Sequence, residues 1–172
     1  LSPLDVVKFS VAFGQWIKNR NTGEKVKIVI GRDARISGEM VRNLVVGSLQ
    51  SLGIDIIDLG LSTTPTVEIA VTDQKAHGGI ILTASHNPKQ WNALKLLNEM
   101  GEFISATDGA DVLSIADNES YVFSEVNDLG KYYQNETYLH KHIQFILDLP
   151  QVNVEAIKKK NFKIAVDAVN ST

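Results

Sequence analysis

Hydrophobic and polar residues along the chain follow two alternating patterns. One is helical, with apolar side chains at intervals of three and four residues, as one buried helix face requires. The other consists of short, nearly continuous apolar runs rich in β-branched residues, which is typical of strands buried on both faces. The helical patterns lie at residues 2–19, 37–53 and 64–75, and the apolar runs lie at 26–30, 54–60 and 78–85. The sequence therefore predicts helices that alternate with strands.

Polar residues mark the starts of the three predicted helices. Ser2 is a candidate N-cap, with Asp5 three residues later. Ser37 is the corresponding candidate for the second helix, and Thr64 followed by Pro65 is the candidate for the third. Side-chain oxygens at these positions satisfy amide groups that have no partner in the first helical turn.

The alternation of strands and helices predicts a mainly parallel sheet, because parallel strands need long crossover connections. Helices then cover both faces of the sheet. The pattern changes at residues 93–98 and 101–105, two short apolar segments separated by a turn at Gly101, where a hairpin or antiparallel edge strand fits better. We therefore expect an α/β fold of three layers, α/β/α, with a mixed and mainly parallel sheet.

The second half of the chain is less regular. Residues 105–127 predict only a short helix, at 112–116. Residues 131–149 predict a long and largely covered helix, which ends before Pro150.

A short polar helix and a new apolar run, residues 162–166, follow this break. A lone strand would be an exposed edge, which a complete protein avoids. We therefore expect residues 1–149 to be a first domain. Residues 150–172 are then a linker helix and the first strand of a second, truncated domain.

The charge distribution argues against nucleic acid as a partner. The net charge is −3, and 17 basic residues are spread among 20 acidic ones, so no basic stripe is available to neutralise a phosphate backbone. No apolar run approaches the roughly 20 residues needed to cross a bilayer, so we expect no membrane association. The chain has no cysteine, which excludes disulfides and thiolate metal sites and favours a cytoplasmic location.

The stretch TASHNP, residues 83–88, closes the third predicted strand. In α/β sheets ligands bind at the carboxyl ends of strands, which is where this stretch places Ser85. Pro88 disfavours helical geometry at Asn87, so the turn is stiff and can hold a hydroxyl in place. Two interpretations remain open: a catalytic serine, or a turn in which Ser85 and Asn87 merely satisfy backbone groups.

A serine hydrolase is poorly supported by the neighbouring residues. Consecutive side chains on an extended segment point to opposite faces, so His86 is badly placed to act as a base for Ser85. The chain also lacks a G-x-S-x-G elbow, a P-loop and a G-x-G-x-x-G segment. His77, His140 and His142 have no metal-ligand context, and we assign them no role.

Four segments together give the chain a family resemblance. They are GRDARISG at 31–38, LGLSTTPT at 59–66, TASHNP at 83–88 and FKIAVDAVNST at 162–172. In this order they resemble the first domain, and the start of the second, of the α-D-phosphohexomutases, the phosphomannomutase and phosphoglucomutase superfamily. TASHNP is similar to the phosphoserine loop of that family. The resemblance implies the fold of a phosphoglucomutase first domain.

The resemblance also implies that Ser85 carries a phosphoryl group and passes it to a hexose phosphate substrate. A hexose 1,6-bisphosphate is then the intermediate and the activator, and hexose 1-phosphate and 6-phosphate are interconverted. Mg²⁺ is implied as the cofactor, held by a phosphoryl oxygen on Ser85 and by three aspartates beyond Thr172. A phosphoserine carries about 1.5 to 2 negative charges, which a divalent cation offsets.

Residues around Ser85 acquire roles from the same resemblance. Lys95 and His86 are candidate catalytic residues. The candidates for supporting the phosphoserine loop and the substrate are Thr83, Asn87, Arg32 and Arg35.

The residues alone leave other interpretations open. Lys95 could simply protect a solvated edge strand against aggregation. Arg32, Asp33 and Arg35 could form a solvated loop with internal ion pairs, or they could support the phosphoserine loop. The chain departs from the family at Ala93, where many members carry a glycine after the asparagine, so we expect a local difference in the backbone.

We expect the chain to be the phosphoryl-carrying part of a phosphohexomutase and to be inactive alone. Family members begin with a glycine-rich segment that carries an active-site arginine, and this chain begins after it, at Leu1. Phosphoglucosamine mutase is an alternative, because the sugar-recognition loop is expected beyond Thr172. An alternative of another class is a non-catalytic sugar-phosphate-binding or regulatory module.

Overall fold

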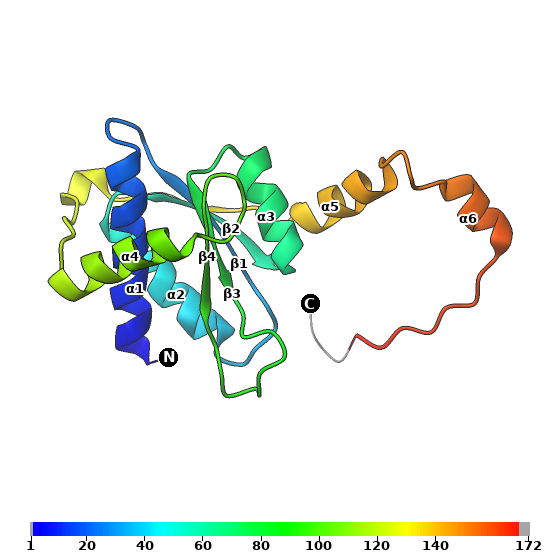
Figure 1. Cartoon of the computed structure of the whole chain (residues 1–172), viewed down its shortest axis with the longest axis horizontal. Helices are drawn as coiled ribbons and strands as arrows, with labels where there is room; N and C mark the ends of the chain where they lie inside the picture. The colour runs from blue at the N-terminus through cyan, green and yellow to red at the C-terminus, as the bar shows by residue number, and fades with distance from the viewer. Residues whose placement is uncertain (1, 169–172) are drawn as a thin grey trace.

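The structure of the chain, a computed structural model, describes residues 2–168 and has a five-stranded sheet at its centre (Figure 1). The strands are β1 (Lys27–Arg32), β2 (Asp55–Leu61), β3 (Gly78–Leu82), β4 (Leu94–Leu97) and β5 (Tyr132–Gln134). Their order across the sheet is β4-β3-β1-β2-β5. All neighbouring pairs are parallel except β3 and β4, which are antiparallel. The prediction of a mixed, mainly parallel sheet is confirmed.

Helices cover both faces of this sheet (Figure 1). They are α1 (Pro3–Arg20), α2 (Gly38–Ser51), α3 (Thr64–Asp73), α4 (Ala106–Asn118), the 3₁₀ helix η1 (Val126–Asp128), α5 (Tyr138–Leu147) and α6 (Val154–Lys160). One buried cluster joins α1, α2 and α4 to Ile28 and Ile30, whereas a second joins α3 to Val29. Successive strand residues point to opposite faces, so β1 contributes to two cores. The three-layer α/β/α architecture is confirmed.

The predicted caps hold at α1 and shift by one residue at α3. The Ser2 hydroxyl accepts from the Asp5 amide at 3.2 Å, and the Asp5 carboxylate accepts from the Ser2 amide at 2.8 Å. The N-cap of α3 is Thr63 rather than Thr64, because Thr63 Oγ1 accepts from the Thr66 amide. None of the helices in the described part of the chain is long and apolar enough to span a bilayer.

The antiparallel edge expected after the serine turn is present as β4. Leu97 pairs with Gly79 of β3 and also forms a bridge to Phe103, which closes a short hairpin. Gly101 lies in the turn with a φ of 74°, and a Cβ there would be 2.5 Å from the Glu68 carbonyl oxygen. Only glycine fits both this backbone conformation and this space.

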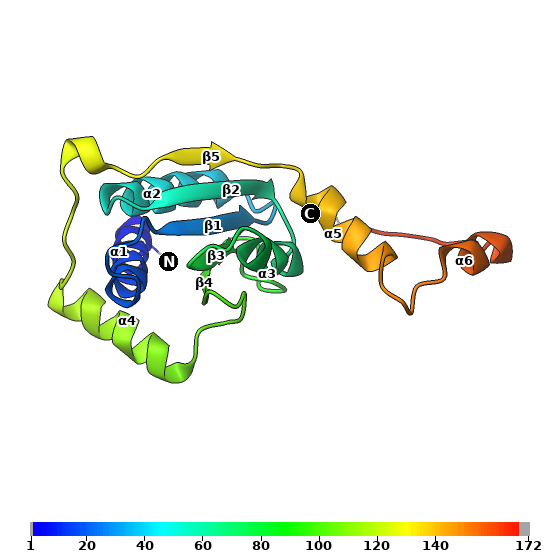
Figure 2. The same ribbon diagram turned by 90° about the horizontal axis from the view of Figure 1, so that it is seen from above.

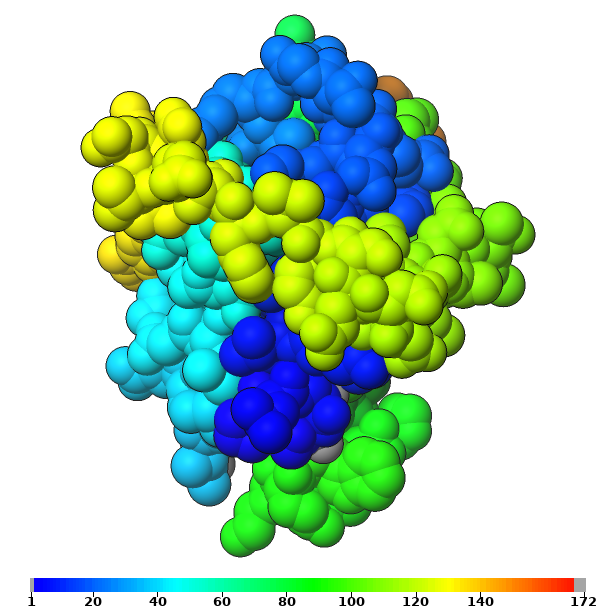
Figure 3. Space-filling model, turned by 90° about the vertical axis from the view of Figure 1, so that its left-hand side faces the viewer, coloured from blue at the N-terminus to red at the C-terminus, as the bar shows by residue number. Residues whose placement is uncertain are grey.

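The helix expected at 112–116 is longer than predicted. α4 begins after Ser105, whose hydroxyl accepts from the Asp108 amide, and the Asp108 carboxylate accepts from the Ser105 amide. This capping box is a sequence signal that our prediction missed. The chain after α4 runs across α1 and the C-terminal end of α2 (Figure 3, yellow-green to yellow). There the Val122 amide donates to Gln15 Oε1 at 3.0 Å.

The segment predicted as one covered helix, 131–149, divides into β5 and α5. β5 pairs with β2, and α5 begins only at Tyr138. Tyr138 is buried, but the other large apolar side chains of α5 are exposed: Leu139, Ile143, Phe145, Ile146 and Leu147. The prediction of a covered helix was wrong, because α5 packs on α3 at its start and then extends away from the sheet (Figure 2).

A buried charged group fixes β5 to β2. Asp58 is 2% exposed, and its Oδ2 accepts from Arg42 at 2.8 Å and from the Tyr132 hydroxyl at 2.7 Å. Asp58 Oδ1 accepts from the Gly60 amide. The hydrogen bond to Asp58 raises the pKa of Arg42 above its usual value.

Residues 162–168 form no strand in the described part of the chain. We predicted a strand at 162–166, but a strand needs a hydrogen-bonded neighbour and the sheet lies far from this segment (Figure 1). The division into domains at residues 149 and 150 stays a prediction. Residues 169–172 of the predicted second-domain segment lie outside the described residues.

Candidate active site

The carboxyl ends of β1 and β3 place two loops side by side. Because these strands are parallel neighbours, the chain leaves both at the same edge of the sheet. The Asp33 amide donates to the Leu82 carbonyl at 3.1 Å, so the pairing continues past the end of β1. We call residues 83–91, which follow β3, the serine loop. Arg35 and Ser85 meet here although 50 positions separate them in sequence.

Ser85 is exposed, with a φ of 54° in the left-handed region. Asn87 satisfies the backbone of the turn, because its amide and its side chain both donate to the Ala84 carbonyl, at 3.0 and 2.9 Å. The Ser85 hydroxyl has no such role among the described residues. Asn87 is therefore the structural residue of the turn, and the Ser85 hydroxyl is presented to solvent.

His86 lies closer to Ser85 than we expected. The expectation assumed an extended backbone, but the left-handed conformation of Ser85 turns the chain. Nδ1 of His86 comes 3.5 Å from Ser85 Oγ, the upper limit of a hydrogen bond. The prediction that these two side chains point to opposite faces was wrong.

Arg35 uses all five N–H donors of its guanidinium group. Nε donates to Asp33 Oδ2 at 3.1 Å. The other four donors bind carbonyl oxygens of the serine loop, namely those of Ser85 (2.7 Å), Asn87 (2.9 Å), Pro88 (2.8 Å) and Trp91 (3.0 Å). A guanidinium presents its donors in a rigid plane, and here each one has an acceptor. Arg35 thus bonds the backbone of the loop at four places.

Asp33 joins Arg35 to the base of the serine loop. Its Oδ1 accepts from the Arg35 amide at 3.0 Å, and its Oδ2 accepts from the Thr83 hydroxyl at 2.6 Å. The Thr83 hydroxyl in turn accepts from the Ser85 amide at 3.0 Å. The side chains of Arg35 and Asp33 are only 10% and 14% exposed, so the pair is shielded from water. The sequence left open whether Asp33 supports this loop, and we did not count it among the site residues, because only the sheet order brings it beside Thr83.

The serine loop is also tied to the start of α2. The Asn92 side chain donates to Ser37 Oγ at 3.1 Å, and the Thr83 amide donates to the Ala93 carbonyl at 3.1 Å. We predicted Ser37 as the N-cap of this helix. It does precede α2, but its hydroxyl makes no cap bond.

Arg32 contacts Asp33 and Ser62 rather than the serine loop. Its Nη1 donates to the Asp33 carbonyl at 3.2 Å, and its own carbonyl accepts from the Ser62 amide. Gly38 leaves room for this side chain, since a Cβ there would lie 3.3 Å from Arg32 Nη1. No hydrogen bond joins Arg32 to the serine loop within the described residues, and its role toward the substrate stays a prediction.

Lys95 lies on β4 directly opposite Ile81. Cross-strand partners share a face of the sheet, and Ile81 belongs to the cluster on the α3 side. The Lys95 ammonium lies 5.7 Å from the centre of the Phe103 ring. No hydrogen bond links Lys95 to Ser85 within the described residues. The amine therefore makes no hydrogen bond to the serine in this structure, and its catalytic role stays a prediction.

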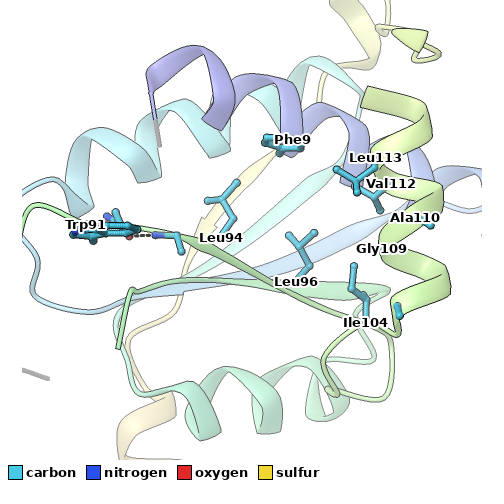
Figure 4. A pocket seen from close by; sticks show the side chains of 12 residues that line it. Phe9, Trp91, Leu94, Leu96, Ile104, Gly109, Ala110, Val112 and Leu113 are labelled. Atoms are coloured by element: carbon cyan, nitrogen blue, oxygen red, sulfur yellow. Dashed lines mark hydrogen bonds between the residues drawn. The ribbon is translucent and has the colours of Figure 1, made fainter. Parts of the chain in front are cut away.

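An apolar groove of about 640 Å³ borders the serine loop at Trp91. Figure 4 shows Phe9 of α1, Leu96 of β4 and Val112 of α4 around it. Ser85 is not among its lining residues. The groove is therefore separate from the serine hydroxyl.

Residues 1–122 match the family model of phosphoglucomutase/phosphomannomutase, alpha/beta/alpha domain I. A phosphoglucomutase/phosphomannomutase from Thermococcus kodakarensis is 35% identical over 170 residues, which cover 99% of this chain and 36% of that protein. A phosphoglucosamine/phosphogalactosamine mutase from Sulfurisphaera tokodaii is 33% identical over 172 residues, with the same two coverages. The chain thus spans little more than a third of the length of these curated relatives.

A solved structure has the same fold. The crystal structure of a phosphoglucomutase/phosphomannomutase family protein from Burkholderia thailandensis superposes with a TM-score of 0.73 and 21% identity. The match covers 87% of this chain and 32% of the other one.

Proposed function

We propose, because the chain belongs to the phosphoglucomutase/phosphomannomutase family, that the full-length protein interconverts hexose 1-phosphate and hexose 6-phosphate. In this proposal Ser85 carries the phosphoryl group. The observation that carries the proposal is the exposed Ser85 hydroxyl, held at the carboxyl edge of the sheet in a loop that Arg35 and Asn87 make stiff. A stiff loop favours catalysis because it holds the reacting oxygen in one geometry.

The reaction would consist of two phosphoryl transfers with a turn of the sugar between them. In the first, the bond from phosphorus to Ser85 Oγ breaks and a bond from phosphorus to the free sugar hydroxyl forms, giving a hexose 1,6-bisphosphate. The hydroxyl proton passes through an acid–base group to the departing Ser85 oxygen, so that protons and charge balance. The second transfer runs in reverse and returns the other phosphate to Ser85. Positioning and electrostatics dominate such transfers.

Two residues are candidates for this proton transfer. Nδ1 of His86 lies 3.5 Å from Ser85 Oγ, so a small rotation would bring it into hydrogen-bond range. Lys95 would have to leave the Phe103 ring, which its flexible stem permits. Profiles of kcat against pH for His86→Gln and Lys95→Gln would separate the two, because only loss of the acid–base group removes a limb of the profile.

The family is generally metal-dependent, and we propose that the metal is Mg²⁺. A phosphoryl oxygen on Ser85 would be one ligand, since Mg²⁺ prefers oxygen, and the bound cation would offset charge on the transferred group. No group of three or more Asp, Glu or His residues able to hold a metal occurs among the described residues. In this proposal the other ligands are the aspartates expected beyond Thr172.

Mass spectrometry and a coupled assay on the full-length protein test the proposal. We expect treatment with glucose 1,6-bisphosphate to add one phosphate at Ser85, and the protein to interconvert glucose 1-phosphate and 6-phosphate. Ser85→Ala should lose both properties. Ordinary turnover in Ser85→Ala would overturn the proposal. Binding of hexose phosphates without turnover by the unaltered protein would favour the non-catalytic module instead.

Phosphoglucosamine mutase is a second candidate, favoured by the name of the Sulfurisphaera tokodaii relative. Comparison of kcat/KM for glucosamine 6-phosphate, glucose 6-phosphate and mannose 6-phosphate decides between the two. A cytoplasmic location is part of the same proposal and rests on the absence of cysteine from the sequence.

A further inference from the structure

We propose that Asp33 is a positioning residue for the phosphoryl transfer at Ser85 and that it acts through the Thr83 hydroxyl. This inference rests on the proposed function and deepens it. Asp33 directly follows β1 and touches none of the reacting atoms. Its carboxylate nevertheless accepts hydrogen bonds from both side-chain groups that hold the serine loop, namely the Thr83 hydroxyl and the Arg35 guanidinium.

The first step of the argument is the direction of the bond between Asp33 and Thr83. An ionised carboxylate only accepts hydrogen bonds, so the Thr83 hydroxyl must donate its single proton to Asp33 Oδ2, at 2.6 Å. Both lone pairs of Thr83 Oγ1 then face away from this bond. One of them accepts from the Ser85 amide at 3.0 Å. Asp33 therefore decides that Thr83 acts as an acceptor toward Ser85.

The second step is the backbone conformation of Ser85. Its φ of 54° is unfavourable for a residue that has a Cβ, and such a conformation persists only where its surroundings hold it. The amide of Ser85 is held by Thr83 and its carbonyl by Arg35, at 2.7 Å. Asp33 bonds both of these residues. The peptide groups on the two sides of Ser85 are thus fixed through one carboxylate.

The third step is what this arrangement leaves free. Thr83 and Arg35 hold the loop through backbone groups and do not use Ser85 Oγ. The loop can therefore keep one shape whether Ser85 carries a phosphoryl group or not. A site that is preorganised in both states requires no rearrangement between the two transfers. The low exposure of Asp33 strengthens the bonds on which this depends.

A mutant cycle in the full-length protein tests this relay. The quantity measured is the rate of phosphoryl transfer from glucose 1,6-bisphosphate to Ser85. The reaction is quenched at successive times, and the intact mass of the protein gives the phosphorylated fraction. Asp33→Asn and Thr83→Val should each slow transfer by about tenfold or more, the order expected for a lost charge-assisted hydrogen bond. Because Asp33 acts through Thr83, adding Thr83→Val to Asp33→Asn should slow transfer no further. Thr83→Ser keeps the hydroxyl and should restore most of the rate.

The matched control is Asp117→Asn, the same chemical change at the exposed ion pair that Asp117 of α4 forms with Lys8 of α1. It should leave the transfer rate unchanged. The KM for hexose phosphate should also stay unchanged in Asp33→Asn, since the substrate does not touch Asp33 in this proposal. Effects of Asp33→Asn and Thr83→Val that multiply, or a Thr83→Ser variant as slow as Thr83→Val, would overturn the relay.

Hydrogen exchange of residues 83–91 provides a readout that does not depend on mutase activity. Asp33→Asn and Thr83→Val should speed exchange of the Ser85 amide, while amides of β1 and α3 keep their protection. Unchanged exchange in the serine loop would refute the inference even if the protein proves to be a mutase. Faster exchange in a protein that shows no turnover would leave the inference standing and remove the proposed function.

Discussion

Nη2 of Arg35 donates a hydrogen bond of 2.7 Å to the carbonyl oxygen of Ser85, across 50 positions of sequence. This bond joins the end of β1 to the serine loop after β3. The shape of the serine loop therefore depends on the loop after β1, which carries none of the atoms expected to react.

Arg35→Lys should disrupt the serine loop although it keeps the charge. An ammonium group has three donors in a tetrahedral arrangement and cannot reproduce five donors in a plane. At least two of the five acceptors, and so at least one loop carbonyl, would lose their partner, and we expect phosphorylation of Ser85 in the full-length protein to slow by about tenfold or more. Mass spectrometry of the intact protein, in samples quenched at successive times, measures this rate. Arg20→Lys, at a surface pair with Asp108, is the control and should behave as wild type.

Ser85→Gly should separate stability from activity. Glycine adopts a φ of 54° without the clash that a Cβ causes, so relief of strain should outweigh the greater freedom of the unfolded chain. We expect the free energy of unfolding to rise by about 0.5 kcal/mol, while phosphorylation at position 85 is lost. Urea denaturation measures the first effect.

Glu119→Gly is the comparison for this prediction. Glu119 caps α4 with a φ of 50°, so the same gain in stability is expected there. Loss of stability in Ser85→Gly together with a gain in Glu119→Gly would contradict the prediction. It would mean that the Ser85 side chain stabilises the loop through a contact that is absent from this structure.

The contact between α5 and α3 should weaken at both ends of the pH range. The hydrogen bond from Tyr138, and then that from Lys141, lowers the pKa of Asp73. This stability is present above the ordinary carboxyl value of 3.8 and is lost as pH falls through the lowered pKa. Burial, and then the bond to Asp73, raises the pKa of Tyr138, so its contribution is present below the usual 10.0 and is lost as pH rises through the raised pKa.

Tyr138→Phe tests this pH dependence. We expect the variant to lower the free energy of unfolding by about 1 kcal/mol near neutral pH, and by less in strong acid and strong alkali. Thermal unfolding over a pH range that extends below 3.8 and above 10.0, the ordinary pKa values of the two groups, gives the difference curve. Tyr133→Phe, on the exposed side of β5, should give a flat curve near zero. A constant difference for Tyr138→Phe at all pH values would contradict the prediction.

Two glycines should respond to alanine in opposite directions. Gly101→Ala forces a φ of 74° on a residue with a Cβ and places that Cβ 2.5 Å from the backbone of Glu68, so a loss of at least about 2 kcal/mol is expected. Gly109 lies inside α4 with nothing within 4 Å, so Gly109→Ala should stabilise the protein by about 0.5 to 1 kcal/mol. Denaturant unfolding measures both. Equal effects would show that the turn at Gly101 can relax.

The sequence alone determined the layers of this protein. Runs of β-branched residues predict buried strands, and capping residues such as Ser2 predict helix starts. Both signals can be read from the sequence because they depend only on residues close together in the chain. The position of Ser85 at the end of a strand was predictable for the same reason. The covered face expected for α5 was not, since apolar spacing indicates which face can be buried but not what lies against it.

The tertiary structure decided how the site is held together. That Asp33 meets Thr83 follows from β1 and β3 being neighbours, which no local pattern states. That Lys95 lies over the Phe103 ring follows from its register opposite Ile81, because a shift of one residue would turn it to the other face. Four of the five acceptors of Arg35 are carbonyl groups, which every residue has and whose directions only the folded backbone sets.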